Sequence, residues 1–309
     1  MNKIIKGFMI AFLVSSSVLI NGIKVQAQEE RKETAVDLLV GVMPATDSAP
    51  IFWADEYGFF EEAGISVQVE LFTNAMNQQS SAQTQQIDVY MASLVEFIIA
   101  RENNSDAGAI TTTTDGVFPI VVSPEYDGGE EVKIGLMEIS VTNYIADLFL
   151  TDYVLDKQFI AEVPLRIQML LAGELDMAVL PEPMATNAAA QGLDKILINE
   201  SQDFSPNVMI FNQETLENDA TIVAAFHEAY NAAVEAMKGQ EDAVRALLIE
   251  RLGLDAAIQD DIILPTYHLT RVPSEEYVEE ARAWVETLLD QKITVTYDEL
   301  VVKDYVSGD

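Results

Sequence analysis

Residues 170–192 constrain the fold more than any other part of the chain. Their sequence, LLAGELDMAVLPEPMATNAAAQG, predicts the end of a helix, a buried strand at 177–180 and a helix over 184–191. A strand that runs into a helix N-terminus places free backbone N–H groups at one edge of a sheet. The same order recurs at three other places in the chain. Strands that alternate with helices predict mainly parallel sheets covered by helices on both faces.

The N-terminus predicts export from the cell. Lys3 and Lys6 precede an apolar run at residues 8–20, and residues 25–27 supply the small side chains of a cleavage site. The apolar run is too short to span a membrane as a helix. We therefore expect residues 1–27 to be a signal peptide and the mature protein to be extracytoplasmic. The alternative is that this segment stays attached as an N-terminal anchor.

Composition and charge exclude several classes of protein. The chain has 309 residues, 49% of them hydrophobic, so it can bury the cores of two domains. It has no cysteine, which excludes disulfides and the lipid-modified cysteine of a lipoprotein, for which Ile23 stands in the expected place. The formal charge is −34. Non-specific nucleic-acid binding is excluded because phosphate contact needs basic clusters.

The order of the predicted elements indicates two lobes. Strands alternate with helices over residues 38–101 and again over 132–198. β-Rich stretches at 109–114 and 118–123 follow the first run, and a connector at 203–212 follows the second. Two connectors predict that the chain crosses into a second lobe and returns, with the late helices packing on the first lobe. The expected parts are the signal peptide 1–27, lobe 1 formed by 28–120 plus 208–309, and lobe 2 formed by 121–207.

Helix boundaries follow from apolar spacing and capping residues. Ser48 is a candidate N-cap for a helix over residues 51–63, and Gly64 suits the position after its end. Ser93 and Glu96 have the spacing of a capping box. Further predicted helices cover residues 141–155, 164–172, Ala220–Met237, Glu241–Leu252, 254–263 and Glu275–Leu289.

Four segments resemble one family of bacterial proteins. They are residues 41–60 (GVMPATDSAPIFWADEYGFF), 87–96 (IDVYMASLVE), 164–192 and 277–305. Their order resembles that of the extracytoplasmic solute-binding proteins of ABC importers, in the NMT1/SsuA-like branch that includes nitrate, taurine, sulfonate and thiamine-pyrimidine binders. The chain departs from the family where Gln85, Gln86 and Ile87 replace its usual glycine, and where a lipid-site cysteine is missing.

The resemblance implies a fold and a function. It implies a two-lobed periplasmic-binding-protein fold of type II, in which the lobes close on a small-molecule ligand in the cleft. The chain would then be a monomer without a cofactor that delivers its ligand to an ABC permease, and it would not be an enzyme. One alternative is an enzyme like the eukaryotic thiamine-pyrimidine synthases of this fold, which the lack of cysteine disfavours. Another is a secreted sensor or adhesion protein.

Ligands of open α/β sheets bind beyond the carboxyl ends of the strands, where helices begin. Four strand-to-helix junctions and the central part of the stretch 111–114 therefore supply the candidate ligand-binding residues. Each candidate also has a structural explanation as a helix cap, a first-turn residue or part of a hinge strand. The candidates are Asp47, Ser48, Ala49, Ala92, Ser93, Thr112, Thr113, Ser140, Thr142, Asn143, Glu182, Pro183 and Met184.

Catalytic and metal-binding patterns are missing from the sequence. His227 and His268 have no cysteine, histidine or carboxylate at metal-ligand spacing, so a structural role is favoured for both. The sequence has no serine-hydrolase elbow, no zinc-protease motif and no P-loop. The acidity of the chain favours a neutral or cationic heterocyclic ligand.

Overall fold

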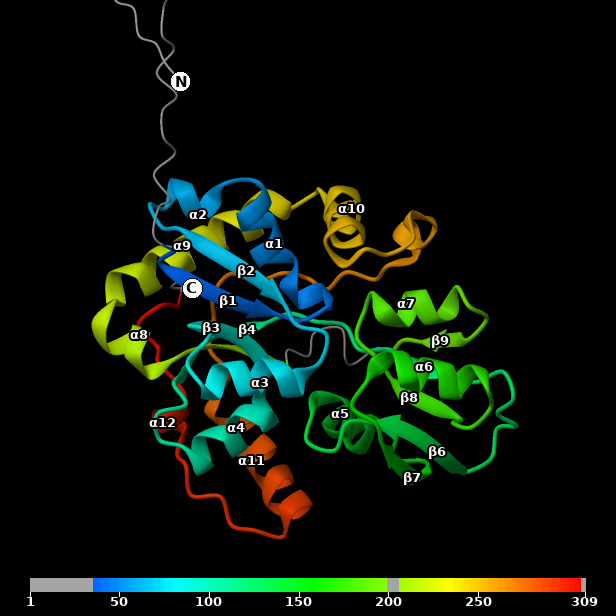
Figure 1. The fold of residues 1–309 in the computed structure, drawn as a ribbon. Coiled ribbons are helices and arrows are strands. Elements are labelled where there is room, and N and C mark those ends of the chain that lie inside the picture. The colour runs from blue at the N-terminus through cyan, green and yellow to red at the C-terminus, as the bar shows by residue number, and fades with distance from the viewer. Residues whose placement is uncertain (1–35, 199–205, 307–309) are drawn as a thin grey trace, which may run out of the picture. The chain divides into compact units, whose positions relative to one another are not determined.

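The computed structural model describes residues 36–198 and 206–306. All of these residues belong to one compact unit, residues 35–309. The unit contains two five-stranded sheets, each flanked by helices (Figure 1). This arrangement confirms the predicted α/β class. The predicted signal peptide, residues 1–27, lies outside the described residues.

The first sheet has the strand order β2-β1-β3-β10-β4. Strand β1 pairs in parallel with β2 and β3, whereas β10 lies antiparallel between β3 and β4. Strand β10 lies within the stretch 203–212 that the sequence predicts as the second connector. The strands are β1 (Leu38–Val42), β2 (Val67–Leu71), β3 (Val89–Ser93), β4 (Ala109–Thr114) and β10 (Asn207–Phe211).

The second sheet repeats this pattern with the order β7-β6-β8-β5-β9. Strand β6 pairs in parallel with β7 and β8, and β5 lies antiparallel between β8 and β9. The strands are β5 (Ile120–Val122), β6 (Glu131–Leu136), β7 (Val154–Phe159), β8 (Met177–Val179) and β9 (Asp194–Ile196).

The chain crosses between the sheets twice. Residues 115–119 lead from β4 in the first sheet to β5 in the second, and the chain returns between β9 and β10. The return includes residues 199–205, which lie outside the described residues. Each crossing leads into a strand that is antiparallel to both of its neighbours. These strands are β5 in one sheet and β10 in the other. The predicted pair of crossing connectors is therefore confirmed.

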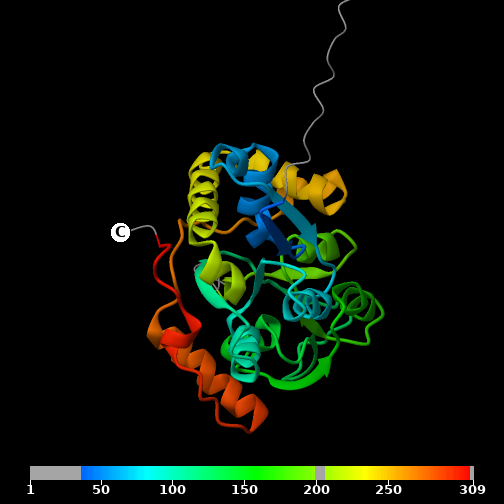
Figure 2. The ribbon, with the colours of Figure 1, turned by 60° about the vertical axis from the view of Figure 1, so that its left-hand side comes forward.

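Helices cover both faces of the first sheet (Figures 1 and 2). One face packs on α1, α2, α9 and α10 around Phe52, Phe211 and Phe226. The other face packs on α4, α11 and α12 around Leu94, Ile110 and Leu300. The helices are α1 (Ala49–Glu56), α2 (Phe59–Glu62), α3 (Ala75–Gln83), α4 (Leu94–Asn103), α8 (Gln213–Asn218), α9 (Ala220–Met237), α10 (Glu241–Leu252), α11 (Glu275–Leu289) and α12 (Tyr297–Leu300), with the 3₁₀ helices η1 (Thr46–Ser48) and η3 (Ala256–Asp261).

The second sheet is covered in the same way. Helix α5 packs on one face through Ile145, and α6 and α7 pack on the other through Ile167 and Ala185. These helices are α5 (Val141–Phe149), α6 (Val163–Leu171) and α7 (Met184–Ala189). Within the described part of the chain, no helix combines the length and the apolar character that crossing a bilayer requires.

Three predicted helices differ in the structure. The helix over residues 51–63 is interrupted after Glu56, because Gly58 has a positive φ of 79° between α1 and α2. The helix over 141–155 ends at Phe149, and the chain then forms the edge strand β7. Residues 154–159 form a strand because they pair with β6. The segment 254–263 contains only the 3₁₀ helix η3.

Gly108 lets the chain enter β4 close to the start of α8. Its φ is +95°, and a Cβ atom built on it would lie 2.0 Å from the carbonyl oxygen of Phe211. We predict that Gly108→Ala lowers the free energy of unfolding by roughly 3 kcal/mol, from positive-φ strain plus a backbone clash. Gly192→Ala is the matched control, since its φ is +102° and its Cβ would meet nothing within 4 Å. Urea unfolding that gives both variants equal losses would contradict the steric part of this explanation.

Candidate ligand-binding site

A cavity of about 320 Å³ lies among turns that follow strands of both sheets. Strands β1, β2 and β3 are parallel to one another, as are β6, β7 and β8, so the carboxyl ends of each set share one edge of their sheet. Each of these six strands is followed by a turn or helix start that lines the cavity. Examples in chain order are Asp47, Asn74, Ser93, Ser140, Ala161 and Pro181.

Six of the predicted ligand-binding residues line this cavity. Each of the four predicted junctions contributes at least one of them, so the four turns face one shared space. They are Asp47 from the first junction, Ala92 and Ser93 from the second, Ser140 and Thr142 from the third, and Met184 from the fourth. Their contact with a ligand remains a prediction.

Ser93 and Ser140 also cap the helices behind them. Ser93 forms the predicted capping box, in which its hydroxyl accepts from the N–H of Glu96 and the Glu96 carboxylate accepts from the N–H of Ser93. The Ser140 hydroxyl accepts from the N–H groups of Thr142 and Asn143. Both hydroxyls are therefore fixed in position on the cavity wall.

The other predicted residues do not line the cavity. Ser48 donates its hydroxyl to the carbonyl of Met43 at 2.7 Å instead of capping α1, and Ala49 is buried in the core. Asn143 donates to the carbonyl of Glu138 and fixes the turn before α5. Pro183 is buried at the start of α7.

Thr112 and Thr113 anchor the segment that follows η3. Both hydroxyls donate to the carbonyl of Arg271, at 3.1 and 3.2 Å, and the N–H of Arg271 returns a bond to the Thr112 hydroxyl. These threonines thus tie β4 to the segment before α11 and stay away from the cavity.

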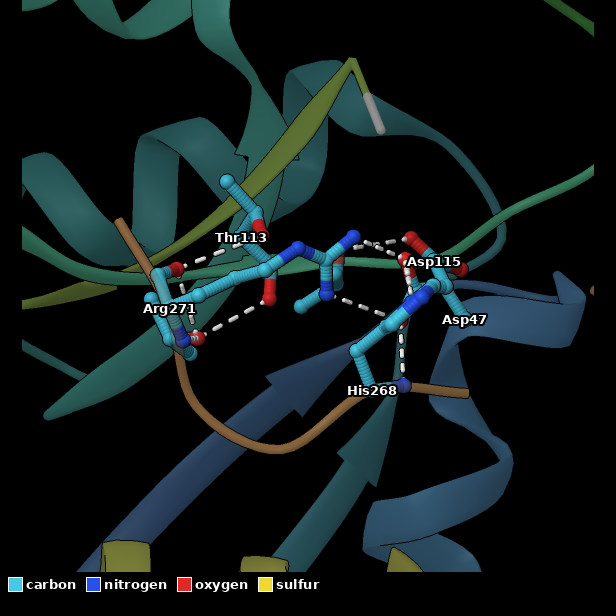
Figure 3. A network of polar contacts seen from close by, with 7 residues as sticks. Asp47, Thr113, Asp115, His268 and Arg271 are labelled. Carbon is cyan, nitrogen blue, oxygen red and sulfur yellow. Dashed lines mark hydrogen bonds and ion pairs between the residues drawn. The ribbon is translucent and has the colours of Figure 1, made fainter. Parts of the chain in front are cut away.

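Figure 3 shows the polar network beside these threonines. The Arg271 guanidinium contacts the buried Asp115 carboxylate at 2.6 and 3.3 Å, and the His268 N–H donates to the same carboxylate at 2.9 Å. Asp115 opens the first crossing between the sheets. The network therefore fixes the start of that crossing to the first sheet.

Glu182 is a buried structural residue. Its side chain is 0% exposed, and its carboxylate contacts the Lys195 ammonium at 2.7 Å and accepts from the N–H and hydroxyl of Thr186. Its backbone carbonyl accepts from the N–H of Thr46, which ties the turn after β8 to the turn after β1. The two turns are joined by backbone, while the carboxylate belongs to a separate ion pair.

Among the predicted residues that line the cavity, Asp47 is the one with a buried polar atom that lacks a hydrogen-bond partner in the described part of the chain. Its Oδ2 accepts from Asn207 Nδ2 at 2.8 Å and from the Thr114 hydroxyl at 3.3 Å, while its buried Oδ1 has no hydrogen-bond partner. Burial raises the pKa of Asp47 to about 6, against the lowering effect of these two hydrogen bonds and with a further rise from nearby Asp115. A buried carboxylate oxygen without a donor, on the wall of a cavity, is an open acceptor for a ligand.

Asn207 and Arg166 are two of several polar cavity residues that sequence reasoning missed; the others include Thr73, Asn74, Gln78, Gln79 and Tyr90. Asn207 lies at the start of β10, and its Oδ1 has no hydrogen-bond partner. Arg166 lies in α6, donates to the carbonyl of Val179 at 3.0 Å and leaves its Nε without a partner. Burial lowers the pKa of Arg166 to about 10, so it is charged at neutral pH. Residues 154–159 read VLDKQF, which lacks the apolar–polar alternation of a half-buried strand, so the sequence carries no clear signal for β7 or for the turn leading to Arg166.

The histidines do not belong to the cavity. His227 is buried, with its ring nitrogens against the carbonyl of Val223 and the hydroxyl of Thr111, and burial lowers its pKa to about 4. In the ranges 36–198 and 206–306 no group of three or more histidine or acidic side chains is placed to hold a metal ion.

The ion pair of Glu182 and Lys195 can be tested by removing one partner. Lys195→Met leaves a fully buried carboxylate without a cation, so we predict a loss of about 3–5 kcal/mol in the free energy of unfolding. The double variant Glu182→Gln with Lys195→Met should recover most of that loss, because neither charge remains. Chemical denaturation of both variants checks this, and equal losses for the single and double variants would contradict it.

Replacing Asp47 should change how the free energy of unfolding depends on pH. The folded state raises the pKa of Asp47 from 3.8 to about 6, so protonation favours folding and this contribution is lost as pH rises through that interval. Relative to wild type, Asp47→Asn should therefore gain roughly 2–3 kcal/mol between pH 4 and pH 7. Paired urea titrations across that range measure the difference. A stability difference that does not change with pH would contradict the prediction.

Comparison with known proteins agrees with this architecture. Residues 45–243 match the profile of the family described as NMT1/THI5 like. No curated protein sequence matches the chain significantly. The structure of the ligand-binding component of an ABC-type import system from Staphylococcus aureus, solved with zinc bound, has a TM-score of 0.73 at 12% identity, covering 87% of this chain and 97% of that one.

Two further structures show the range of proteins with this fold. The periplasmic aliphatic sulphonate-binding protein SsuA from Escherichia coli has a TM-score of 0.67 at 14% identity, covering 88% of this chain and 94% of its own. The desulfurization enzyme DSZB has a TM-score of 0.58 at 13% identity, covering 86% and 97%. At these identities the structures establish the periplasmic-binding-protein fold, and the profile match over most of the chain establishes that it belongs to the NMT1/THI5-like family.

Proposed function

We propose that this protein is the substrate-binding component of an ABC importer, which captures a small organic solute and delivers it to a membrane permease. The supporting observation is the cavity whose walls come from the strand ends of both sheets. A volume of about 320 Å³ suits a small molecule. The relatives named as ligand-binding components of import systems have the same fold.

Capture would proceed by closure of two lobes. In this proposal lobe 1 comprises residues 28–120 and 208–309 around the first sheet, and lobe 2 comprises residues 121–207 around the second. The two crossings act as the hinge, since they connect the sheets covalently. A solute that contacts both lobes stabilises the closed state because only that state offers both sets of contacts.

The protein would work outside the cytoplasm as a monomer. The predicted signal peptide supports export, and membership of a family of binding proteins supports the same location. The absence of cysteine from the chain means that a lipid-modified cysteine cannot retain it at the membrane. Retention would then depend on the permease, on the cell envelope or on an N-terminal segment that stays attached.

Binding is better supported than catalysis. The Ser93 hydroxyl lies 2.5 Å from the Glu96 carboxylate, and burial raises the pKa of that carboxyl. An activated serine needs an adjacent general base, and neither His227 nor His268 lines the cavity. The Ser93–Glu96 pair is explained as the capping box of α4. DSZB shows that the fold can also carry an enzyme, so measuring turnover of the bound solute belongs with the binding assay.

The direct test is native mass spectrometry of protein purified from its natural source. The proposal predicts a small solute that co-purifies in a one-to-one complex, and loss of uptake of that solute when the gene is deleted. Uptake that continues unchanged in the deletion strain would contradict the transport role. Conversion of the solute by the purified protein would favour an enzyme.

Filling the cavity gives a structural test. Ala161 lines the cavity between β7 and α6, and we predict that Ala161→Trp weakens solute binding at least tenfold because the indole occupies the binding volume. Ala190→Trp is the control, since Ala190 is exposed beyond α7 and lies outside the cavity lining. Calorimetry on both variants, with circular dichroism to confirm folding, measures the effect. Equal affinities for Ala161→Trp and wild type would place the solute elsewhere.

A further inference from the structure

Two side chains of opposite charge line the same cavity without contacting each other. Asp47 comes from the turn after β1 in the first sheet, and Arg166 comes from α6 on the second sheet. No ion pair joins either of them to another residue in the part of the chain that the structure describes. Burying an unpaired charge is costly, so each charge implies a partner that arrives from outside.

We propose that the captured solute is dipolar, with a protonated amine or amidine held by Asp47 and Asn207 and an anionic group held by Arg166. This inference rests on the proposed function and specifies the class of solute. Its chemistry follows from three parts of the cavity wall.

The first part is a pair of open acceptors. Asp47 is 2% exposed, and its Oδ1 lacks a donor, as does Oδ1 of Asn207. The bond from Asn207 Nδ2 to Asp47 Oδ2 holds the two groups side by side. Two acceptor oxygens on neighbouring side chains fit the two N–H groups of an ammonium or amidinium ion.

The second part is an open donor. Arg166 is 3% exposed, and the one hydrogen bond of its guanidinium among the described residues goes to the neutral carbonyl of Val179. Glu162 acts on Arg166 through space but is exposed and forms no ion pair with it. A guanidinium of this kind is suited to an incoming carboxylate or sulfonate, which it can bind with two parallel N–H bonds.

The third part is the apolar lining of the cavity. Its side chains include Phe72, Phe97, Phe118, Met137 and Leu252. They suit a hydrocarbon chain or ring as the body of the solute. The remaining acidic lining residue, Glu96, already accepts from the N–H and hydroxyl of Ser93, so it is not the open acceptor.

A solute that is only a cation or only an anion cannot pair with both charged side chains of the cavity. A simple amine would leave the buried Arg166 guanidinium without an anion. A simple acid would leave the buried Asp47 carboxylate without a cation. A dipolar solute neutralises both charges, and because they come from different sheets it also connects the two lobes. The same contacts that give specificity would then favour closure.

The test compares matched solutes by calorimetry. The panel contains para-(aminomethyl)benzoate with benzylamine and benzoate, and aminocaproate with hexylamine and caproate. We expect the zwitterion of a set to bind at least about 30-fold more tightly than either singly charged member. Asp47→Asn should reduce zwitterion binding to the level of the acid, and Arg166→Met to the level of the amine. Arg166→Lys, which keeps the charge, should retain part of the affinity and guards against a folding defect.

The outcomes separate the dipolar assignment from the proposed function. A singly charged or neutral solute that binds as tightly as the zwitterion overturns the dipolar assignment, and so does a zwitterion whose affinity survives in Asp47→Asn and Arg166→Met. Binding of neither zwitterion overturns it as well. In each case, uptake and co-purification of the natural solute judge the transport role independently.

Discussion

The double crossing of the chain determines how this protein forms the cavity between its sheets. Each sheet gains its one reversed strand, β10 or β5, directly after a crossing, and that strand is hydrogen-bonded on both sides inside its sheet. The connectors are therefore fixed at their ends by backbone pairing. The strands that remain parallel present their carboxyl ends, with the helix starts that follow, to the space between the sheets.

Charged side chains of the same kind differ in their pairing, depending on whether they line the cavity or lie outside it. Asp115, at the start of the first crossing, is buried and fully engaged with Arg271 and His268, which secures the connector. Asp47 is just as buried and lines the cavity, but its Oδ1 has no hydrogen-bond partner. The same contrast holds between Lys195, paired with Glu182, and Arg166, which has only a carbonyl partner. Hydrogen bonding and ion pairing are thus more complete around the cavity than on its wall, a difference that is common at functional sites.

Much of this organisation could be predicted from the sequence. Strands that run into helices fixed the α/β class, and four of the six junctions around the cavity were found because the apolar strand and the capping residue stand next to each other in the sequence. The side-chain roles could not be found in this way. Glu182 pairs with Lys195 beyond α7, and Thr112 bonds to Arg271 far along the chain, so their roles depend on tertiary contacts.

One wrong boundary explains the largest omission. Residues 141–155 are apolar enough to continue a helix, but pairing with β6 turns the segment after Tyr153 into β7. Because β7 was not predicted, the turn between β7 and α6 could not be assigned to the edge of the sheet where ligands bind. Arg166, in the helix that follows this turn, was therefore not predicted as a site residue. Asn207 was missed for another reason, since it begins β10, and the start of a strand carries no capping or strand-end signal.

The central claim is that the two lobes close on a solute held between them. Because the chain has no cysteine, two introduced cysteines can be labelled without background. Met76 in α3 and Leu165 in α6 are 63% and 44% exposed, and their neighbours Ala75 and Arg166 line the cavity from opposite sheets. Pulsed electron spin resonance on the spin-labelled pair Met76→Cys and Leu165→Cys reports the distance across the cavity. Adding the solute that co-purifies with the protein should shorten and narrow this distance distribution. A distribution that stays unchanged when the solute saturates the site would contradict the account.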